Sequence, residues 1–148
     1  MTKPIWHGGS FPTTVFNELA DTCLNGHLGM EIIEAGDDWI RARMPVDQRT
    51  RQPFGLLHGG ASVALAETLA SQGAFATIDP TRKAAVGMEI NANHVRPAKD
   101  GFVYGEARPE AMGRNTQVWS IRITNEAGKL VCISRCTMAI IDRPKDQA

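Results

Sequence analysis

The stretch from residue 52 to residue 78 constrains this chain most, because it is almost free of charge. Its sequence, QPFGLLHGGASVALAETLASQGAFATI, contains one side chain that is ionised at neutral pH, Glu67. The run of Ala, Val and Leu predicts a helix from about Gly59 to Thr77. A helix so poor in polar residues has no solvent face, so we expect the domain to wrap around it. Burying a lone carboxylate is costly, which points to a catalytic role for Glu67.

The rest of the chain predicts one domain, residues 1–148, because this length suits a single core and is too short for two ordinary ones. Apolar residues at helical spacing predict an amphipathic covering helix that is capped by Thr13 or Thr14 and stops at Asn25-Gly26. Residues 30–35 and 39–44 flank a Gly-Asp-Asp turn and predict a hairpin.

Four further strands are predicted after the central helix. They cover residues 85–95, 102–112, 116–124 and 129–141, and their short turns predict an antiparallel meander. One antiparallel sheet that curls around the apolar helix is the simplest arrangement that buries it. The sequence therefore predicts an α+β fold with about six strands.

Composition excludes several functional classes. The formal net charge is zero and no long basic block occurs, so nucleic-acid binding has little electrostatic support. No signal peptide and no apolar segment of membrane-spanning length is visible, so we expect a cytoplasmic protein without a membrane partner. The three cysteines, Cys23, Cys132 and Cys136, lack metal-site spacing and are interpreted as reduced thiols.

The motifs of this chain resemble those of the hotdog-fold acyl-CoA thioesterases. The resemblance runs from about Phe16 to Ile141 and depends on QPFGLLHGGASVALAE, PVDQRT, INANHVR and QVWSI. It is strongest to the branch that contains the 1,4-dihydroxy-2-naphthoyl-CoA thioesterases and the enterobactin-pathway proofreading thioesterases. It implies a curled sheet around a central helix, dimers with a continuous sheet, and usually a homotetramer.

The central stretch also suits thioester hydrolysis on chemical grounds. Glu67 could act as general base or as a nucleophile through a transient anhydride, and the sequence does not choose between these routes. Gly59 and Gly60 begin the helix, where free N–H groups and the positive end of the dipole can bind a carbonyl oxygen or an oxyanion.

Helix geometry predicts that one chain cannot complete this site. Gly59 and Glu67 are eight residues apart, or about 12 Å at a rise of 1.5 Å per residue. Reacting groups must approach to about 3 to 3.5 Å. We therefore expect the helix start of one subunit to meet Glu67 of another, and an isolated monomer to be inactive.

The resemblance implies roles for further residues. It makes the Gly59 amide the group that polarises the carbonyl, with Gln52 and His58 holding the carbonyl and the attacking water. It assigns Thr68 and Ser71 to hydrogen bonds near the carboxylate. The segments that it implies for coenzyme A are Gly87, then His94, Val95, Arg96 and Pro97, and finally Ala111, Met112, Gly113, Arg114, Asn115 and Thr116.

Structural roles remain open for several of these residues. Glu67 could be tied to a distant arginine, His58 could only cap the helix, and His94 could pack in the core. His58 and Glu67 lie nine residues apart without a third ligand nearby, so no metal is expected. Ser62 is not in a nucleophile elbow, and the usual His–acid pattern of a hotdog dehydratase is absent.

The leading functional hypothesis is hydrolysis of an aromatic acyl-CoA without a cofactor, with 1,4-dihydroxy-2-naphthoyl-CoA in menaquinone biosynthesis as the first choice. The alternatives are a proofreading or housekeeping thioesterase for aryl carrier proteins or for phenylacetyl- and benzoyl-type CoA. A non-catalytic acyl-CoA binding module is a third hypothesis. The expected partners are the acyl-CoA substrate, a second copy in a homodimer or homotetramer, and, for the proofreading alternative, an acyl carrier protein.

Overall fold

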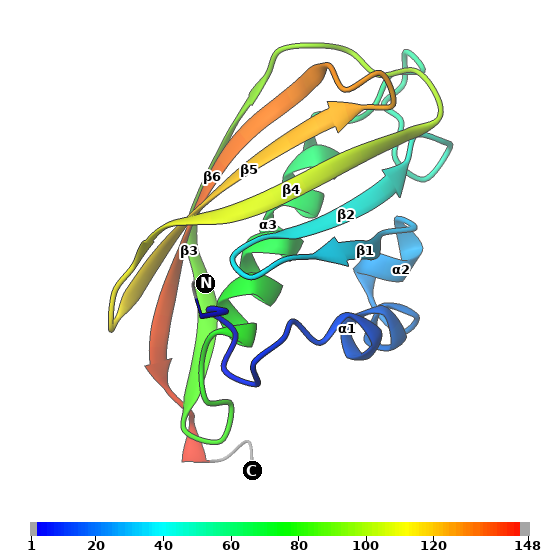
Figure 1. Ribbon diagram of the computed structural model, residues 1–148. Coiled ribbons are helices and arrows are strands. Elements are labelled where there is room, and N and C mark those ends of the chain that lie inside the picture. The colour runs from blue at the N-terminus through cyan, green and yellow to red at the C-terminus, as the bar shows by residue number, and fades with distance from the viewer. Residues whose placement is uncertain (1–2, 146–148) are drawn as a thin grey trace.

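The computed structural model describes residues 3–145, and in it a six-stranded antiparallel sheet curls around one long helix, α3 (Figure 1). The predicted α+β architecture is therefore confirmed. Two short helices, α1 and α2, lie beside the outer hairpin. The elements in chain order are α1 (Thr13–Ala20), α2 (Leu24–His27), β1 (Glu31–Ala35), β2 (Ile40–Pro45), α3 (Gly59–Ala76), β3 (Lys83–His94), β4 (Phe102–Met112), β5 (Thr116–Asn125) and β6 (Leu130–Asp142).

The strand order is β1-β2-β4-β5-β6-β3, which confirms the β1–β2 hairpin but not a four-strand meander. Of the four strands after α3, β4, β5 and β6 pair in sequence order, while β3 pairs with β6 and forms the edge opposite β1. The physical reason is α3, which crosses the concave face and delivers the chain to the far edge of the sheet (Figure 1).

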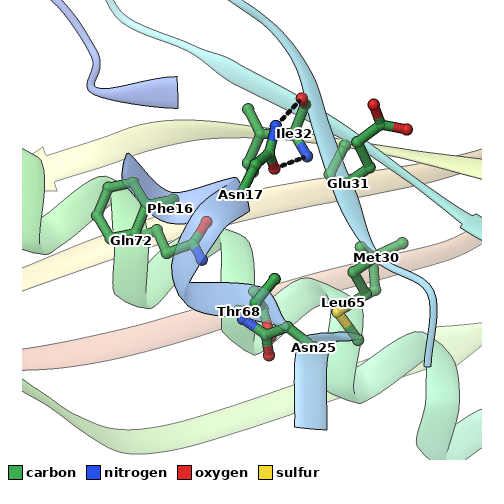
Figure 2. Close-up of a pocket in the computed structure, with 11 residues that line it drawn as sticks. Phe16, Asn17, Asn25, Met30, Glu31, Ile32, Leu65, Thr68 and Gln72 are labelled. Carbon is green, nitrogen blue, oxygen red and sulfur yellow. Dashed lines mark hydrogen bonds between the residues drawn. The ribbon is translucent and has the colours of Figure 1, made fainter. Parts of the chain in front are cut away.

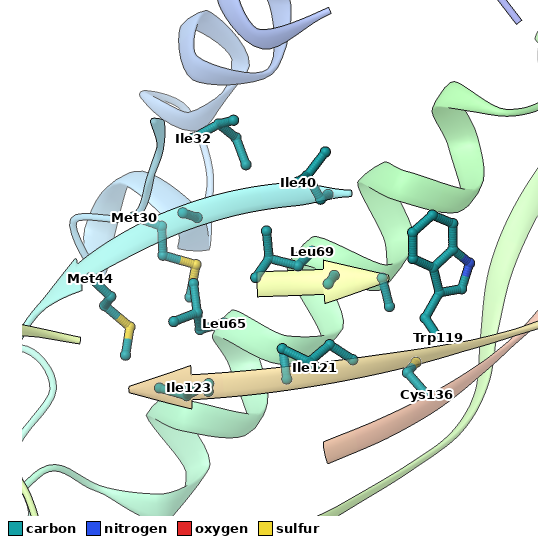
Figure 3. Close-up of a cluster of buried hydrophobic side chains, with 14 of the residues drawn as sticks. Met30, Ile32, Ile40, Met44, Leu65, Leu69, Trp119, Ile121, Ile123 and Cys136 are labelled. Atoms are coloured by element: carbon teal, nitrogen blue, oxygen red, sulfur yellow. The ribbon is translucent and has the colours of Figure 1, made fainter. Parts of the chain in front are cut away.

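One face of α3 carries the core. Leu65, Leu69 and Ala70 are fully buried against the inward side chains of the sheet, among them Ile121 and Trp119 (Figure 3). Close packing requires small residues here: a Cβ at Gly73 would come within 2.8 Å of the Trp119 ring. The tight fit holds α3 rigidly against the sheet.

The other face of α3 is open, so the expectation that the domain wraps the helix completely is wrong for a single chain. Glu67 and Phe75 are exposed, and Ala64, Thr68 and Ser71 are only half-buried. The sheet covers one side of the helix, and α1 and α2 cover this side only in part, through contacts such as Phe16 with Phe75 and Asn25 with Thr68. The low polarity of α3 therefore does not reflect burial within one subunit alone.

The predicted N-terminal helix is broken into two. Thr13 lies inside α1, whose N-cap is Pro12 without a side-chain hydrogen bond, so the expected threonine cap is wrong. The helix ends at Ala20, and Asn25 and Gly26 belong to α2 instead of stopping the first helix. Here the chain folds back so closely that a Cβ at Gly26 would lie 2.3 Å from the Ala20 carbonyl oxygen. Among residues 3–145, no helix has the length and hydropathy needed to cross a membrane.

Candidate active site

A tight turn leads the chain into α3 and is fixed by hydrogen bonds. The Gln52 N–H donates to the Leu56 carbonyl at 2.8 Å, and the Gly55 N–H donates to the Gln52 carbonyl at 3.0 Å. Gly55 has φ +84°, a conformation that glycine adopts without strain. Two more bonds, from Leu57 N–H to the Ala98 carbonyl and from His58 N–H to the Thr50 carbonyl, attach the turn to the domain, each at 2.8 Å.

His58 is the N-cap of α3. Its Nδ1 accepts a hydrogen bond from the Gly60 N–H at 2.8 Å. This is the capping role that the sequence left open, and because Nδ1 accepts a hydrogen bond, Nε2 is the ring nitrogen that can donate. The ring is exposed, so the Nε2–H can donate to another group.

The backbone amide of Gly59 differs from that of Gly60 in its hydrogen bonding. Within residues 3–145, its N–H has no hydrogen-bond acceptor, whereas that of Gly60 is used by His58. The His94 ring lies directly against Gly59: a Cβ there would come within 2.9 Å of His94 Nε2. A free N–H at the positive end of a helix can donate a hydrogen bond to a carbonyl oxygen or an oxyanion.

Gln52 lies at the same opening. Its side-chain oxygen accepts a hydrogen bond from the Phe54 N–H, so the amide NH₂ is the group left to donate to a ligand. The structure brings Gln52, Gly59 and His94 together in one pocket, here called the helix-start pocket. It measures about 370 Å³ and is lined by Gln52, Leu56, Leu57, Gly59, Ser62, His94, Val95, Arg96, Pro97 and Val131.

Glu67 lies in a second pocket on the open face of α3. Its carboxylate touches the backbone of β3: a Cβ at Gly87 would come within 2.7 Å of Glu67 Oε1. No arginine or lysine among the described residues forms an ion pair with it. This glutamate pocket measures about 380 Å³ and is lined by Leu24, Asn25, Ala64, Glu67, Thr68, Ser71 and Gln72.

Thr68 and Ser71, which are predicted to form hydrogen bonds near the Glu67 carboxylate, contact other groups within one chain. The Thr68 hydroxyl donates to Asn25 Oδ1 at 3.3 Å, and the Ser71 hydroxyl lies 3.9 Å from the Met138 sulfur. Both still line the glutamate pocket. The expectation that Glu67 is shut inside apolar surroundings is wrong for one chain, because the carboxylate faces the opening and not the core.

A small cavity lies beneath α1 and shares Asn25, Thr68 and Gln72 with the glutamate pocket (Figure 2). It holds about 10 Å³, close to the space of one water molecule. Gln72 Oε1 is buried there without a hydrogen-bond partner among the described residues. Neither Asn25 nor Gln72 is among the site residues that the sequence predicts. The only signal for Gln72 was an amide in an otherwise apolar helix, and Asn25 had been interpreted as a helix stop.

The predicted coenzyme A segments are divided between two ends of the sheet. Arg96 lines the helix-start pocket and donates to the Leu130 carbonyl. Arg114 lies in the β4–β5 turn near the other end of α3, where Gln117 bonds Thr77 at 2.9 Å. Ala111 lines a different hollow, on the sheet face turned away from α3. One chain therefore does not bring Arg96, Ala111 and Arg114 to a single ligand.

The two main pockets also stay apart within one chain. Gly59 and Glu67 are both on α3, eight residues from each other, which gives about 12 Å between their positions. Each pocket holds part of a hydrolytic site: oxygen-binding donors in one and a carboxylate in the other. No group of three His, Cys, Asp or Glu side chains within residues 3–145 has the arrangement of a metal site.

The fold and the pockets define a hotdog-type hydrolase, and comparison with known proteins gives the family. A sequence model of the thioesterase superfamily matches residues 54–132. The chain belongs to this superfamily and is an acyl-CoA thioesterase. It is 48% identical over 125 residues to the 1,4-dihydroxy-2-naphthoyl-CoA hydrolase of Escherichia coli, covering 84% of this chain and 91% of that protein. It is 50% identical over 117 residues to the proofreading thioesterase EntH of Cronobacter turicensis, covering 78% and 83%.

Solved structures agree with this assignment. A thioesterase of Haemophilus influenzae superposes with a TM-score of 0.91 at 46% identity, covering 97% of this chain and 99% of that chain. An alanine variant of a Staphylococcus aureus homologue superposes with a TM-score of 0.79 at 41% identity, covering 82% and 100%. That variant replaces a glutamate of the Staphylococcus aureus protein, which is a thioesterase. A second solved variant of the same protein replaces a glutamine 15 residues earlier in its sequence.

Proposed function

We propose that this protein hydrolyses an aromatic acyl-CoA thioester to the free acid and coenzyme A. The observation that carries the proposal is the pair of half-sites on α3. Among residues 3–145, the Gly59 N–H at the helix start has no acceptor, and the Glu67 carboxylate eight residues further along has no ion-pair partner. The spacing of Gln52 and Glu67 is 15 residues, the same as between the glutamine and the glutamate replaced in the Staphylococcus aureus thioesterase.

The proposed reaction uses donors at the carbonyl and a base at the water. The thioester oxygen binds the Gly59 N–H, and the negative charge that develops on it is stabilised there. Gln52 Nε2 and the His58 Nε2–H are the further donors, because the opposite atom of each side chain is already hydrogen-bonded. Glu67 removes a proton from water, which attacks the carbonyl carbon. The C–S bond then breaks, and the departing sulfur takes up that proton, which releases the thiol of coenzyme A and leaves Glu67 ionised again.

A nucleophilic route is equally compatible with these residues. In it a Glu67 oxygen attacks the thioester, the thiol leaves, and water then hydrolyses the resulting anhydride. The exposed position of Glu67 beside Gly87 leaves room for either attack.

The proposed assembly is a dimer in which each site combines the helix-start pocket of one subunit with the glutamate pocket of the other. The edge strand β3 supports it, because a long unprotected edge is a template for pairing with another chain. Its Met88 side chain is 62% exposed, and Val86 is also exposed. A homotetramer made of two such dimers is the proposed full assembly.

The proposed dimer also affects which of the predicted coenzyme A segments can contact the same ligand. Gly87 and His94 to Pro97 adjoin the two halves of the proposed site, whereas Ala111 to Thr116 can reach it only from a different subunit. We propose that the β4–β5 turn, with Arg114, contacts the coenzyme A bound at a neighbouring subunit's helix-start pocket. Arginine suits the phosphates of the nucleotide because it remains charged and offers several donors.

The proposed acyl group is 1,4-dihydroxy-2-naphthoyl, which would place the protein in menaquinone biosynthesis in the cytoplasm. The support is the 48% identity to the Escherichia coli hydrolase of that name. Proofreading of mis-acylated aryl carrier proteins is the alternative, supported by the 50% identity to EntH. Comparing kcat/KM for 1,4-dihydroxy-2-naphthoyl-CoA, benzoyl-CoA, phenylacetyl-CoA and one acylated aryl carrier protein distinguishes the two.

The decisive experiment measures release of free coenzyme A by wild type and by Glu67→Gln, which keeps the size of the side chain and removes the charge. We expect kcat to fall about 10³-fold with the fold intact. The matched control is Glu34→Gln, an exposed carboxylate on the opposite sheet edge, which should leave kcat unchanged. Binding of acyl-CoA without release by wild type would instead favour the non-catalytic module.

A further inference from the structure

Phe54 is exceptionally exposed for a large apolar side chain, at 88%. Its backbone is nevertheless fixed, because its N–H donates to Gln52 Oε1 within the hydrogen-bonded turn of residues 52–56. An isolated exposed apolar residue needs no explanation. A phenyl ring held outward by a rigid turn beside a catalytic pocket is different, because covering it requires little further ordering of the backbone.

The glutamate pocket has an apolar wall that is also uncovered. Leu24 from α2 lines this pocket together with Ala64 and is 58% exposed. Across the opening, the described part of the same chain provides no second apolar wall, since the remaining lining residues are polar. An acyl ring bound beside Glu67 would therefore contact Leu24 on one side and solvent on the other.

The turn that carries Phe54 is rigidly connected to Gly59. The two residues are five positions apart, and the segment between them is fixed to the domain through Leu57 and His58, by the bonds to Ala98 and Thr50. The proposed function brings Gly59 of one subunit to Glu67 of its partner. Because hydrogen bonds hold the turn and the helix start together, an assembly that brings Gly59 to the partner's Glu67 also brings the turn of residues 52–56 near that partner's glutamate pocket.

We propose that Phe54 of one subunit forms the missing wall of the acyl pocket in its partner, opposite Leu24, and thereby selects planar aromatic acyl groups. This inference rests on the proposed composite site. An aromatic acyl ring would lie between the phenyl ring and the leucine side chain, where offset or edge-to-face aromatic contacts are favourable. A short alkyl acyl group would be too small to contact both walls at once.

The first test is a comparison of substrates. Phe54→Ala should lower kcat/KM for benzoyl-CoA about 10-fold or more while changing kcat/KM for acetyl-CoA less than about 3-fold. For Phe54→Leu, kcat/KM for benzoyl-CoA should lie between the values of wild type and Phe54→Ala. The matched control is Ile33→Ala, another exposed apolar residue on the far edge strand β1, which should change neither value. An unchanged ratio of benzoyl-CoA to acetyl-CoA hydrolysis in Phe54→Ala would overturn the proposal.

The second test asks which subunit supplies each residue. Mixed dimers of Phe54→Ala and Glu67→Gln contain one fully intact site if Phe54 acts in the partner's pocket, so about half of the wild-type activity should return. Mixed dimers of Leu24→Ala and Glu67→Gln should stay inactive with benzoyl-CoA, because Leu24 and Glu67 belong to the same chain's pocket. Absence of recovery in the first mixture as well would show that Phe54 acts within its own chain and would overturn the proposal.

A third test does not depend on activity. In a Cys23→Ser background, Phe54→Cys combined with Leu24→Cys should give a covalently linked dimer with a short bis-maleimide, seen on a denaturing gel, because the width of the acyl ring between the two positions is too large for a direct disulfide. A monomer band alone, as expected for either cysteine variant by itself, would contradict the proposed contact. If wild type releases no coenzyme A from any thioester, the proposed reaction fails, whereas the cross-link still reports on the contact. If wild type is active and Phe54→Ala has unchanged activity, only the proposed role of Phe54 in the acyl pocket is refuted.

Discussion

The two faces of α3 belong to one helix of low polarity but lie in different surroundings. Leu65 and Leu69 on one face are fully buried by the sheet, whereas Glu67 and Phe75 on the other are exposed in the single chain. The buried face fills the core and holds the helix in place. The open face carries the only carboxylate of the helix and one of the two main pockets.

The difference teaches that the low polarity of α3 serves two separate purposes. On the buried face, apolar side chains supply the hydrophobic driving force for folding. On the open face, small and weakly polar side chains leave space for a ligand and, in the proposed dimer, for the helix-start pocket of a second subunit. Variants can therefore separate stability from catalysis along the same helix.

Leu69→Ala on the buried face should have the largest effect on stability. Leu69 packs so closely against β4 that a Cβ at Gly105 would lie 2.7 Å from its Cδ1. Removing the side chain should lower the free energy of unfolding by about 2–5 kcal/mol, from lost apolar burial and the cavity left behind. Urea unfolding followed by circular dichroism measures this. The comparison is Ser71→Ala on the open face, and an equal loss there would contradict the distinction between the faces.

A charge on the β3 edge should have the next largest effect. Met88→Asp introduces a carboxylate on the strand that the proposed dimer pairs, so we expect a shift toward monomer and a loss of activity of roughly 10-fold or more at low protein concentration. Light scattering and coenzyme A release measured on the same samples test this. Ile33→Asp at the β1 edge is the control, and full activity of a monomeric Met88→Asp would refute the composite site.

Much of the fold could be predicted from local patterns. The central helix was predicted at about residues 59–77 and observed at 59–76, and the strands agree within about two residues. These elements follow from hydrophobic periodicity and turn residues close to them in sequence. The neighbour of β3 could not be predicted in this way, because it depends on where α3 delivers the chain across the sheet.

The candidate site was only partly accessible to sequence reasoning. Gln52, Gly59 and His94 lie in one pocket, but Glu67 lies in another and is exposed instead of buried. An apolar helix carries the same pattern whether its own chain or a partner covers it. The contribution of Leu24 to the glutamate pocket depends on the break between α1 and α2, which helical spacing did not indicate.

Two substitutions of His58 can separate its role as the N-cap of α3 from its proposed role as a hydrogen-bond donor to the thioester. His58→Asn keeps a side-chain acceptor suited to the N-cap and removes the Nε2–H donor, whereas His58→Ala removes both. We expect His58→Ala to lose about 1 kcal/mol of stability and His58→Asn to lose little. Both should lower kcat if the imidazole donates to the thioester. Thermal unfolding and steady-state kinetics on both variants separate the roles, and full activity of His58→Asn would reduce His58 to a cap.

The three cysteines should differ in reactivity while the fold stays intact. Burial, followed by the charges of Glu67 and Glu89, raises the pKa of the Cys136 thiol to about 11, and burial raises the pKa of Cys132. Both thiols are therefore protonated at pH 8 and shielded from reagents, whereas Cys23 is exposed. Titration with an aromatic disulfide reagent should modify Cys23 at once and the other two only after denaturation. Rapid reaction of Cys136 in the folded protein would mean that the buried face of the sheet opens more readily than its packing indicates.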